Sequence, residues 1–153
     1  VARPGAGFFW GVSRGTWVTA FFSGPTPFPA FRREDPEAVE TRRYDLSSLR
    51  TLFLAGERAD PATVAWAEGA LGVPVIDHWW QTETGAIMIA PLPGAVDLKA
   101  GSATLPMFGV QPGLMDPDGK ELEGAASGNL VIKSSWPSQI RTVYGDHQRL
   151  IDT

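Results

Sequence analysis

The strongest constraint on the fold is a pair of short apolar runs that flank a single helical pattern. The runs are Thr-Leu-Phe-Leu-Ala at residues 51–55 and Val-Pro-Val-Ile-Asp at residues 73–77. Short uninterrupted apolar runs are typical of strands buried on both faces of a parallel sheet. Between them, Asp60 and Pro61 mark a helix start, and Gly72 marks a helix stop. The pattern therefore predicts a parallel strand–helix–strand unit.

The character of the sequence changes near Gly85. Before it we expect another strand at residues 16–22, a short helix near residues 30–33 and an exposed charged segment at residues 34–43. After it, short β-rich runs at residues 86–90, 110–115 and 129–133 alternate with turns, including Asp-Pro-Asp-Gly at residues 116–119. We therefore predict an α/β fold with two segments. A parallel sheet portion spans about residues 1–85, and a mostly β portion spans about residues 86–153.

Composition narrows the class of protein. Of 153 residues, 43% are apolar and 20% are charged, as in a globular domain. The net charge of −4 argues against a nucleic-acid partner, and the lack of cysteine excludes disulfides and thiolate metal sites. No apolar run has the length of a membrane span, so we expect no membrane partner and a cytoplasmic location, with a mitochondrial one left open. Four tryptophans are expected in the core: Trp10, Trp17, Trp66 and Trp136.

The segment whose residue types are best suited to binding a ligand is Asp-His-Trp-Trp-Gln-Thr-Glu-Thr-Gly at residues 77–85. It directly follows a predicted parallel strand, and ligands in open α/β sheets bind at the carboxyl ends of strands. Indole rings can stack on a purine, threonine hydroxyls can donate to phosphate, and the Glu83 carboxylate can hold Mg²⁺. The alternative is a turn with two core tryptophans and solvated polar residues. Residue types alone do not decide between these two interpretations.

A second polar patch, Ala-Gly-Glu-Arg-Ala-Asp at residues 55–60, follows the neighbouring predicted strand. Gly56 allows a ligand to approach the backbone closely, which favours a functional interpretation for Gly56 and Glu57. For Asp60 the simpler interpretation is a helix cap. A third patch at residues 23–26 lacks a phosphate-binding loop pattern and is interpreted as a plain turn.

Two long runs resemble the AMP-forming acetyl- and propionyl-CoA synthetases, which belong to the adenylate-forming enzyme superfamily. They are Tyr-Asp-Leu-Ser-Ser-Leu-Arg-Thr-Leu-Phe-Leu-Ala-Gly-Glu-Arg at residues 44–58 and Val-Pro-Val-Ile-Asp-His-Trp-Trp-Gln-Thr-Glu-Thr-Gly at residues 73–85. The resemblance continues at residues 91–94, 101–104, 108–112 and 128–132. It covers almost the whole chain from about Trp17 onward.

The resemblance implies a ligase with small-molecule partners: ATP, a short carboxylate such as acetate or propionate, and coenzyme A. A carboxylate attacks ATP to give acyl-AMP and pyrophosphate, and coenzyme A then displaces AMP. Mg²⁺ is the implied metal. Physically, such chemistry requires stabilisation of charge on the phosphoryl oxygens.

The resemblance also implies roles for individual residues. In the nucleotide site, Trp79 stacks on adenine, Asp77 lies where the backbone meets the adenine amino group, and Thr82 binds phosphate. Glu83 is the implied Mg²⁺ ligand and, with Thr82, the implied catalytic pair. Trp80 closes the acyl pocket. The resemblance also implies that the nucleotide site includes Gly56, Glu57, Arg58, His78 and Gln81. It further implies that Ala55 lines the acyl pocket.

The chain departs from the family pattern in three respects. The Gly-Glu-Arg-Ala motif at residues 56–59 is closer to propionyl-type members, whereas residues 86–89 and 108–112 are closer to acetyl-type members. Pro29 is expected to strain the helix near residues 30–33. The resemblance leads us to expect a phosphate loop upstream, and a Tyr-x-Thr-Gly-Asp segment and a C-terminal lid domain with its lysine downstream, and none of them has a match within residues 1–153.

We therefore expect an internal fragment of the large N-terminal domain. Alone it should bind AMP weakly at most and should form no thioester. The alternative is a non-catalytic, degenerate nucleotide-binding or scaffold module, whose reading frame would end near residue 153.

Overall fold

The computed structural model describes residues 5–152. These residues form two compact units, one of residues 5–79 and 90–104 and one of residues 80–89 and 105–152. The elements of the first unit are α1 (Ala6–Gly15), β1 (Ala20–Ser23), α2 (Pro27–Glu34), η1 (Thr41–Arg43), β2 (Thr51–Leu54), α3 (Pro61–Leu71) and β3 (Val75–Asp77). Those of the second unit are β4 (Pro112–Met115), β5 (Glu121–Leu122), β6 (Asn129–Ile132) and α4 (His147–Ile151). The predicted α/β class is confirmed.

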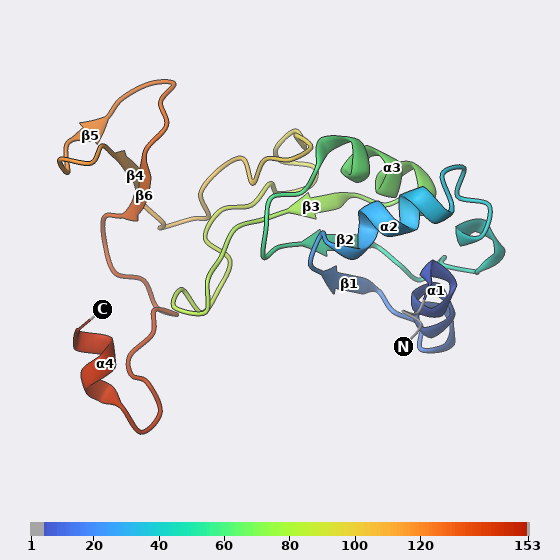
Figure 1. The fold of residues 1–153 in the computed structure, drawn as a ribbon, viewed down its shortest axis with the longest axis horizontal. Helices are drawn as coiled ribbons and strands as arrows, with labels where there is room; N and C mark the ends of the chain where they lie inside the picture. The colour runs from blue at the N-terminus through green and yellow to red at the C-terminus, as the bar shows by residue number, and fades with distance from the viewer. Residues whose placement is uncertain (1–4, 153) are drawn as a thin grey trace. The chain divides into compact units, whose positions relative to one another are not determined.

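A three-stranded parallel sheet forms the centre of the first unit, with the strands in the order β1-β2-β3 (Figure 1). Its register places Phe22 opposite Phe53 and Phe53 opposite Ile76. The predicted unit of β2, α3 and β3 is therefore confirmed.

Helix α3 begins and ends where the sequence predicts. The Asp60 carboxylate accepts a hydrogen bond from the Thr63 backbone N–H at 2.9 Å, and Pro61 occupies the first turn, where its missing N–H costs nothing. Gly72 ends the helix in the left-handed conformation, with φ 67°.

The core lies between the sheet and its helices, and α2 and α3 cover one face of the sheet (Figure 1). Leu52, Leu54 and Val75 alternate with residues that point to the opposite face, so every second strand residue enters this core. The buried cluster comprises Trp10, Phe28, Phe31, Leu52, Leu54, Ala59, Val64, Ala67 and Val75, with Trp66 packed against it.

The predicted strand at residues 16–22 begins too early, because α1 continues to Gly15 and β1 starts at Ala20. The helix ends in a Schellman motif, in which Val18 N–H bonds Ser13 O at 3.1 Å and Trp17 N–H bonds Arg14 O at 3.4 Å. This motif holds Trp17 at φ 53° and leaves its side chain 72% exposed. The prediction of a core position is therefore wrong for Trp17, whereas it is confirmed for Trp10. Trp136 is half-buried.

Pro29 lies inside α2 without interrupting it. The strain expected there does not arise, because Pro27 and Pro29 fall in the first turn, where backbone N–H groups have no intrahelical acceptor.

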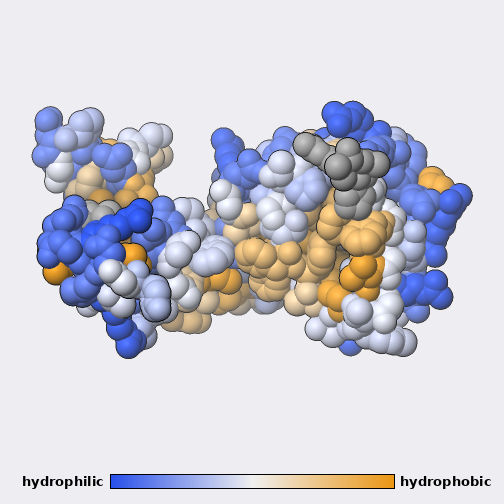
Figure 2. Space-filling model, turned by 60° about the horizontal axis from the view of Figure 1, so that its bottom comes forward, coloured by the Kyte–Doolittle hydropathy of each residue, from blue (hydrophilic) through white to orange (hydrophobic). Residues whose placement is uncertain are grey.

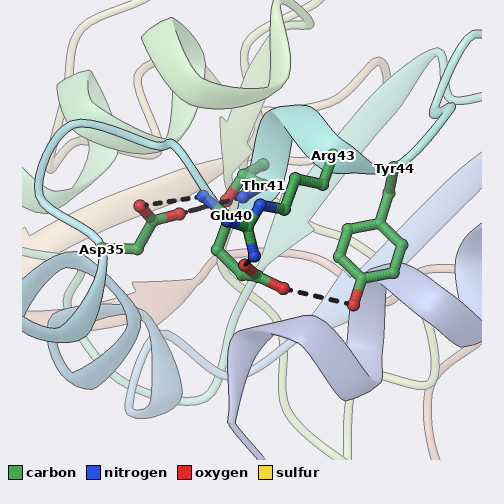
Figure 3. A network of polar contacts seen from close by, with 5 residues as sticks. All are labelled: Asp35, Glu40, Thr41, Arg43 and Tyr44. Atoms are coloured by element: carbon green, nitrogen blue, oxygen red, sulfur yellow. Dashed lines mark hydrogen bonds and ion pairs between the residues drawn. The ribbon is translucent and has the colours of Figure 1, made fainter.

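The charged segment at residues 34–43 is not uniformly exposed, in contrast to the prediction. The Asp35 side chain is buried and accepts three hydrogen bonds, from Glu40 N–H at 3.1 Å, Thr41 N–H at 2.9 Å and the Thr41 hydroxyl at 3.0 Å (Figure 3). Glu40 in turn contacts Arg43 at 2.7 Å and the Tyr44 hydroxyl at 3.4 Å. A buried carboxylate thus anchors the connection between α2 and β2, which sequence pattern alone assigned to solvent.

The second unit contains an antiparallel sheet in the order β5-β4-β6. Strands β4 and β6 confirm two of the predicted runs, and the predicted turn is closed by the Asp116 carboxylate, which accepts Asp118 N–H at 3.0 Å and Lys120 N–H at 2.8 Å. The strand predicted at residues 86–90 is absent from the described structure, where only Ile89 forms an isolated bridge, with Pro106. Within residues 5–152, no helix combines the length and apolar character that a membrane crossing requires.

Apolar side chains are exposed on the part of the chain that contains α1 and β1 (Figure 2). They include Phe8, Val12 and Phe22. Strand β1 is an edge strand in the described sheet, since it pairs with β2 alone. Exposed apolar edges of this kind promote association.

We predict that Asp35→Asn lowers the free energy of unfolding by about 2 kcal/mol, because charge-assisted hydrogen bonds are replaced by weaker ones. Burial by itself raises the pKa of Asp35, but the hydrogen bonds from Thr41 and Glu40 bring it below its ordinary value. The carboxylate therefore stabilises the fold above the unfolded-state pKa of about 4. This contribution is lost as the pH falls through the lower folded-state pKa.

Urea unfolding between pH 2.5 and 7 measures both effects, with Glu34→Gln as a control at an exposed neighbouring carboxylate. A gap between wild type and Asp35→Asn that stays constant over this pH range would contradict the assigned role.

Candidate functional site

The carboxyl ends of three parallel strands meet at one edge of the first unit. Backbone hydrogen bonds set their alignment: Ala55 N–H bonds Ser23 O at 3.2 Å, and His78 N–H bonds Leu54 O at 3.0 Å. The loops that follow β1, β2 and β3 therefore leave the sheet at the same level. This is the edge at which open α/β sheets bind their ligands.

The loop after β2 is open to solvent and carries Gly56, Glu57 and Arg58. Gly56 has φ 104°, a conformation that side chains other than glycine rarely adopt, and no atom would meet an added Cβ within 4 Å. The Thr26 hydroxyl, from the loop after β1, donates a hydrogen bond to Glu57 Oε1. Two adjacent strand-end loops are thereby linked through side chains.

Asp77 ends β3 with its side chain only 9% exposed. Burial raises the pKa of the Asp77 carboxyl above its ordinary value, and this outweighs the lowering by His78, the Ala59 backbone N–H and Arg58. Asp77 thus connects the loop after β2 with the end of β3. Ala55, the residue predicted for the acyl pocket, directly follows β2 and is buried.

His78 and Trp79 follow directly. The His78 ring is 3% exposed and lies edge-on to Phe22 and Phe53, with ring centroids 5.4 and 5.7 Å away. Trp79 is half-buried. A partly exposed indole at a strand end is a residue type that can stack on a planar ring.

The turn at residues 81–85 belongs to the second unit and presents Gln81, Thr82 and Glu83 to solvent. Buried Thr84 closes the turn: its hydroxyl accepts Gln81 N–H at 2.9 Å and lies 2.8 Å from Gln81 O and 3.0 Å from Ala86 O. The hydroxyl therefore fixes the backbone on both sides of Thr82 and Glu83.

A C-terminal segment clamps the same turn from outside. The Trp136 indole N–H and the Ser138 hydroxyl both donate to Thr84 O at 2.8 Å, and Ile140 N–H donates to Glu83 O at 2.9 Å. A Cβ on Gly85 would lie 2.2 Å from Ser138 O, so only glycine fits. The exposed side chains of Thr82 and Glu83 thus sit on a backbone that is held at several points.

The described residues provide no cluster of side chains that could enclose a metal ion by itself. Among residues 5–152, no group of three or more histidine, aspartate or glutamate side chains could enclose a metal ion. Mg²⁺ does not need such a cage, because it usually keeps several waters and binds through one or two carboxylates plus substrate phosphates. The exposed Glu83 carboxylate fits that mode of binding.

The predicted site residues fall into two groups. Ala55, Gly56, Glu57, Arg58, Asp77, His78 and Trp79 are brought together at the strand ends of the first unit. Trp80, 38% exposed, and Gln81, Thr82 and Glu83 belong to the clamped turn of the second unit.

Two residues at the site were missed by sequence reasoning. Thr26 follows a strand and carries a hydroxyl, which was a usable signal. The clamping role of Thr84 had no signal, because its partners Trp136 and Ser138 lie more than fifty residues away in sequence.

We predict that Thr84→Val destabilises the turn by about 1–3 kcal/mol, since valine keeps the shape but leaves backbone groups of residues 81 and 86 unpaired. Faster hydrogen exchange at the Gln81 amide should report the loss. Thr84→Ser should restore protection, and Thr82→Val, at an exposed hydroxyl, should leave it unchanged. Equal exchange rates in Thr84→Val and wild type would show that the hydroxyl does not hold the turn.

Known proteins match this chain over nearly its whole length. The family model described as "AMP-binding enzyme" matches residues 2–140. The chain is 60% identical to an acetyl-coenzyme A synthetase of Alcanivorax borkumensis and 53% identical to one of Alkalilimnicola ehrlichii, covering 98% of this chain and 23% of each relative. The crystal structure of the anthranilate CoA ligase AuaEII in complex with anthranoyl-AMP matches with a TM-score of 0.76 at 26% identity, over 97% of this chain and 29% of that one. The chain therefore belongs to the AMP-binding enzyme family, and it spans 23% of the length of the curated relatives it matches.

Proposed function

We propose that this chain is part of a ligase that activates a short carboxylic acid with ATP and transfers the acyl group to coenzyme A. The observation that carries the proposal is the 60% identity to an acetyl-coenzyme A synthetase, which extends over 98% of the chain. The three aligned strand ends supply the physical basis, since this edge suits a nucleotide.

The first unit supplies the nucleotide-binding residues in this proposal. The open backbone at Gly56 lets the adenylate approach the loop after β2, with Glu57 and Arg58 beside it. The Trp79 indole stacks on adenine, and the backbone at Asp77 meets the adenine amino group. The backbone hydrogen bond from His78 N–H to Leu54 O keeps these two strand ends at a fixed spacing.

The second unit supplies the phosphate-binding residues. The Thr82 hydroxyl donates to a phosphate oxygen, and Gln81 shares the same turn. Glu83 would hold Mg²⁺, which supplies positive charge beside the phosphates when bound. A turn anchored by Thr84 favours catalysis, because donors fixed in advance need no reorganisation during the reaction.

The proposed reaction has two steps. A carboxylate oxygen of the acid attacks the α-phosphorus of ATP, and pyrophosphate leaves to give acyl-AMP. The thiolate of coenzyme A then attacks the acyl carbon, and AMP leaves. Trp80 and Ala55 bound the acyl group in this proposal, and the bulk of the indole limits it to acetate or propionate.

The proposal predicts that Glu83→Gln reduces acyl-AMP formation roughly 100-fold or more, because one ligand for the charge-stabilising metal is lost. The protein of the complete reading frame that contains residues 1–153 should be used, with pyrophosphate release as the readout. The Mg²⁺ concentration for half-maximal rate should rise, while AMP affinity without Mg²⁺ should stay within about twofold.

Glu123→Gln, at an exposed carboxylate directly after β5, is the matched control. Wild-type levels of activity in Glu83→Gln would remove Glu83 from the metal site. Absence of acyl-AMP formation by the wild-type protein with any short acid would contradict the proposed function.

A second prediction concerns acyl-chain length. Trp80→Gly should shift the preference toward longer acids, by roughly fourfold in kcat/KM per additional buried methylene. Trp17→Gly, which removes another exposed indole at a position whose φ of 53° glycine tolerates, should leave the preference unchanged. An unaltered chain-length profile for Trp80→Gly would exclude Trp80 from the acyl pocket.

A further inference from the structure

The carbonyl oxygen of buried Thr84 accepts two side-chain hydrogen bonds from one distant segment of the second unit. The Trp136 indole N–H and the Ser138 hydroxyl both donate to it at 2.8 Å. A single donor is enough to satisfy a buried carbonyl group, whose oxygen has two lone pairs. The second hydrogen bond is therefore not needed to satisfy the oxygen, and its effect is to restrict the direction in which the carbonyl group points.

The segment that supplies these two donors is itself ordered. Gln139 N–H donates to Trp136 O at 3.2 Å and closes a β-turn, with Pro137 at the second position, where proline is favoured. The Arg141 guanidinium donates to Pro137 O at 3.3 Å. The β-turn therefore fixes where the Trp136 and Ser138 donors lie relative to each other.

The same segment also holds the preceding peptide group of the turn at residues 81–85. Ile140 N–H donates to Glu83 O at 2.9 Å, and this carbonyl group lies directly before that of Thr84 in the chain. Because each peptide group is planar, holding two successive carbonyl groups restricts the backbone that joins them. Residues 136–140 thus hold the backbone on the C-terminal side of Glu83.

The N-terminal side of Thr82 is held within the turn itself. Gln81 O accepts hydrogen bonds from Thr84 N–H at 3.1 Å and from Gly85 N–H at 3.3 Å. The exposed side chains of Thr82 and Glu83 form no hydrogen bond or ion pair of their own with the residues of 5–152. Their directions are therefore set by the backbone on either side of them.

We propose that Trp136 is a positioning residue for acyl-AMP formation, which acts through the Thr84 carbonyl to hold the backbone that carries the Glu83 carboxylate. The inference rests on the proposed function, in which Glu83 is the Mg²⁺ ligand. Trp136 touches no reacting group in that mechanism. Its contribution is to keep an exposed carboxylate, which has no side-chain partner, in one place, because small displacements of a ligand-holding group slow a reaction that depends on alignment.

The test uses the protein of the complete reading frame. Trp136→Phe keeps an aromatic ring but removes the indole N–H, and Ser138 still satisfies the Thr84 carbonyl. Trp66→Phe is the matched control, because Trp66 is also half-buried and its indole N–H also donates to a backbone carbonyl, Pro36 O, at 3.0 Å. Trp66 belongs to the first unit and has no part in the proposed site.

We expect Trp136→Phe to lower kcat for pyrophosphate release roughly tenfold at saturating ATP, since one hydrogen bond that fixes the turn is lost. The Mg²⁺ concentration for half-maximal rate should rise, while AMP affinity without Mg²⁺ should stay within about twofold. In a Glu83→Gln background the same substitution should change kcat by less than about twofold, because the residue through which Trp136 acts is already altered. Trp66→Phe should leave kcat unchanged in both backgrounds.

Hydrogen exchange of the protein without Mg²⁺ reports on the turn directly. Exchange over residues 80–86 should become roughly tenfold faster in Trp136→Phe and stay unchanged in Trp66→Phe. Ser138→Ala removes the other donor to the Thr84 carbonyl and should produce the same rise in exchange and the same fall in kcat. This second variant decides the question if Trp136→Phe does not fold, as judged by its thermal unfolding.

Unchanged kcat or unchanged exchange in Trp136→Phe would overturn the inference while leaving the proposed function intact. An equal loss of kcat in the wild-type and Glu83→Gln backgrounds would also overturn it, because a purely structural contribution is additive. Wild-type activity of Glu83→Gln would remove the metal ligand on which the inference depends. A wild-type protein that forms no acyl-AMP would overturn both the inference and the proposed function.

Discussion

The register of the parallel sheet is the constraint on which the candidate site depends. Two backbone hydrogen bonds, from Ala55 N–H to Ser23 O and from His78 N–H to Leu54 O, hold three strand ends level with one another. Because side chains alternate along a strand, the same register decides which residues enter the helix-covered core and which face the other side. A slip of one residue would exchange Asp77 with His78 and destroy the arrangement.

The strand-end loops add side-chain links to this backbone frame. Thr26 joins the loops after β1 and β2 through Glu57, and Asp77 joins the loop after β2 to β3 through the backbone of Ala59. Glycine at position 56 leaves the surface between these links unobstructed. The combination gives a polar, accessible edge on a buried, apolar sheet, which is the usual setting for ligand binding in this fold class.

The turn at residues 81–85 is held by side-chain hydrogen bonds to its backbone and not by the pairing of strands. Its exposed members, Thr82 and Glu83, make no contribution to a core, and their positions come from hydrogen bonds made by their neighbours. Thr84 closes the turn from within, and Trp136 and Ser138 hold its carbonyl from a distant segment. Hydrogen bonds from one side chain also hold the segment between α2 and β2, where the buried Asp35 carboxylate accepts three of them.

Local sequence determined the elements whose signals are short-range: the parallel unit of β2, α3 and β3, the Asp60 cap, the Gly72 stop and the turn at residues 116–119. It also placed the predicted site residues at strand ends, because apolar runs and their stops can be read within a few residues. Tertiary structure decided what depends on distant partners. It exposed Trp17, buried Asp35, replaced the strand expected at residues 86–90 with an isolated bridge and gave Thr84 its clamp. Burial and hydrogen-bond partners are set by which segments pack together, and that information is absent from any local window of the sequence.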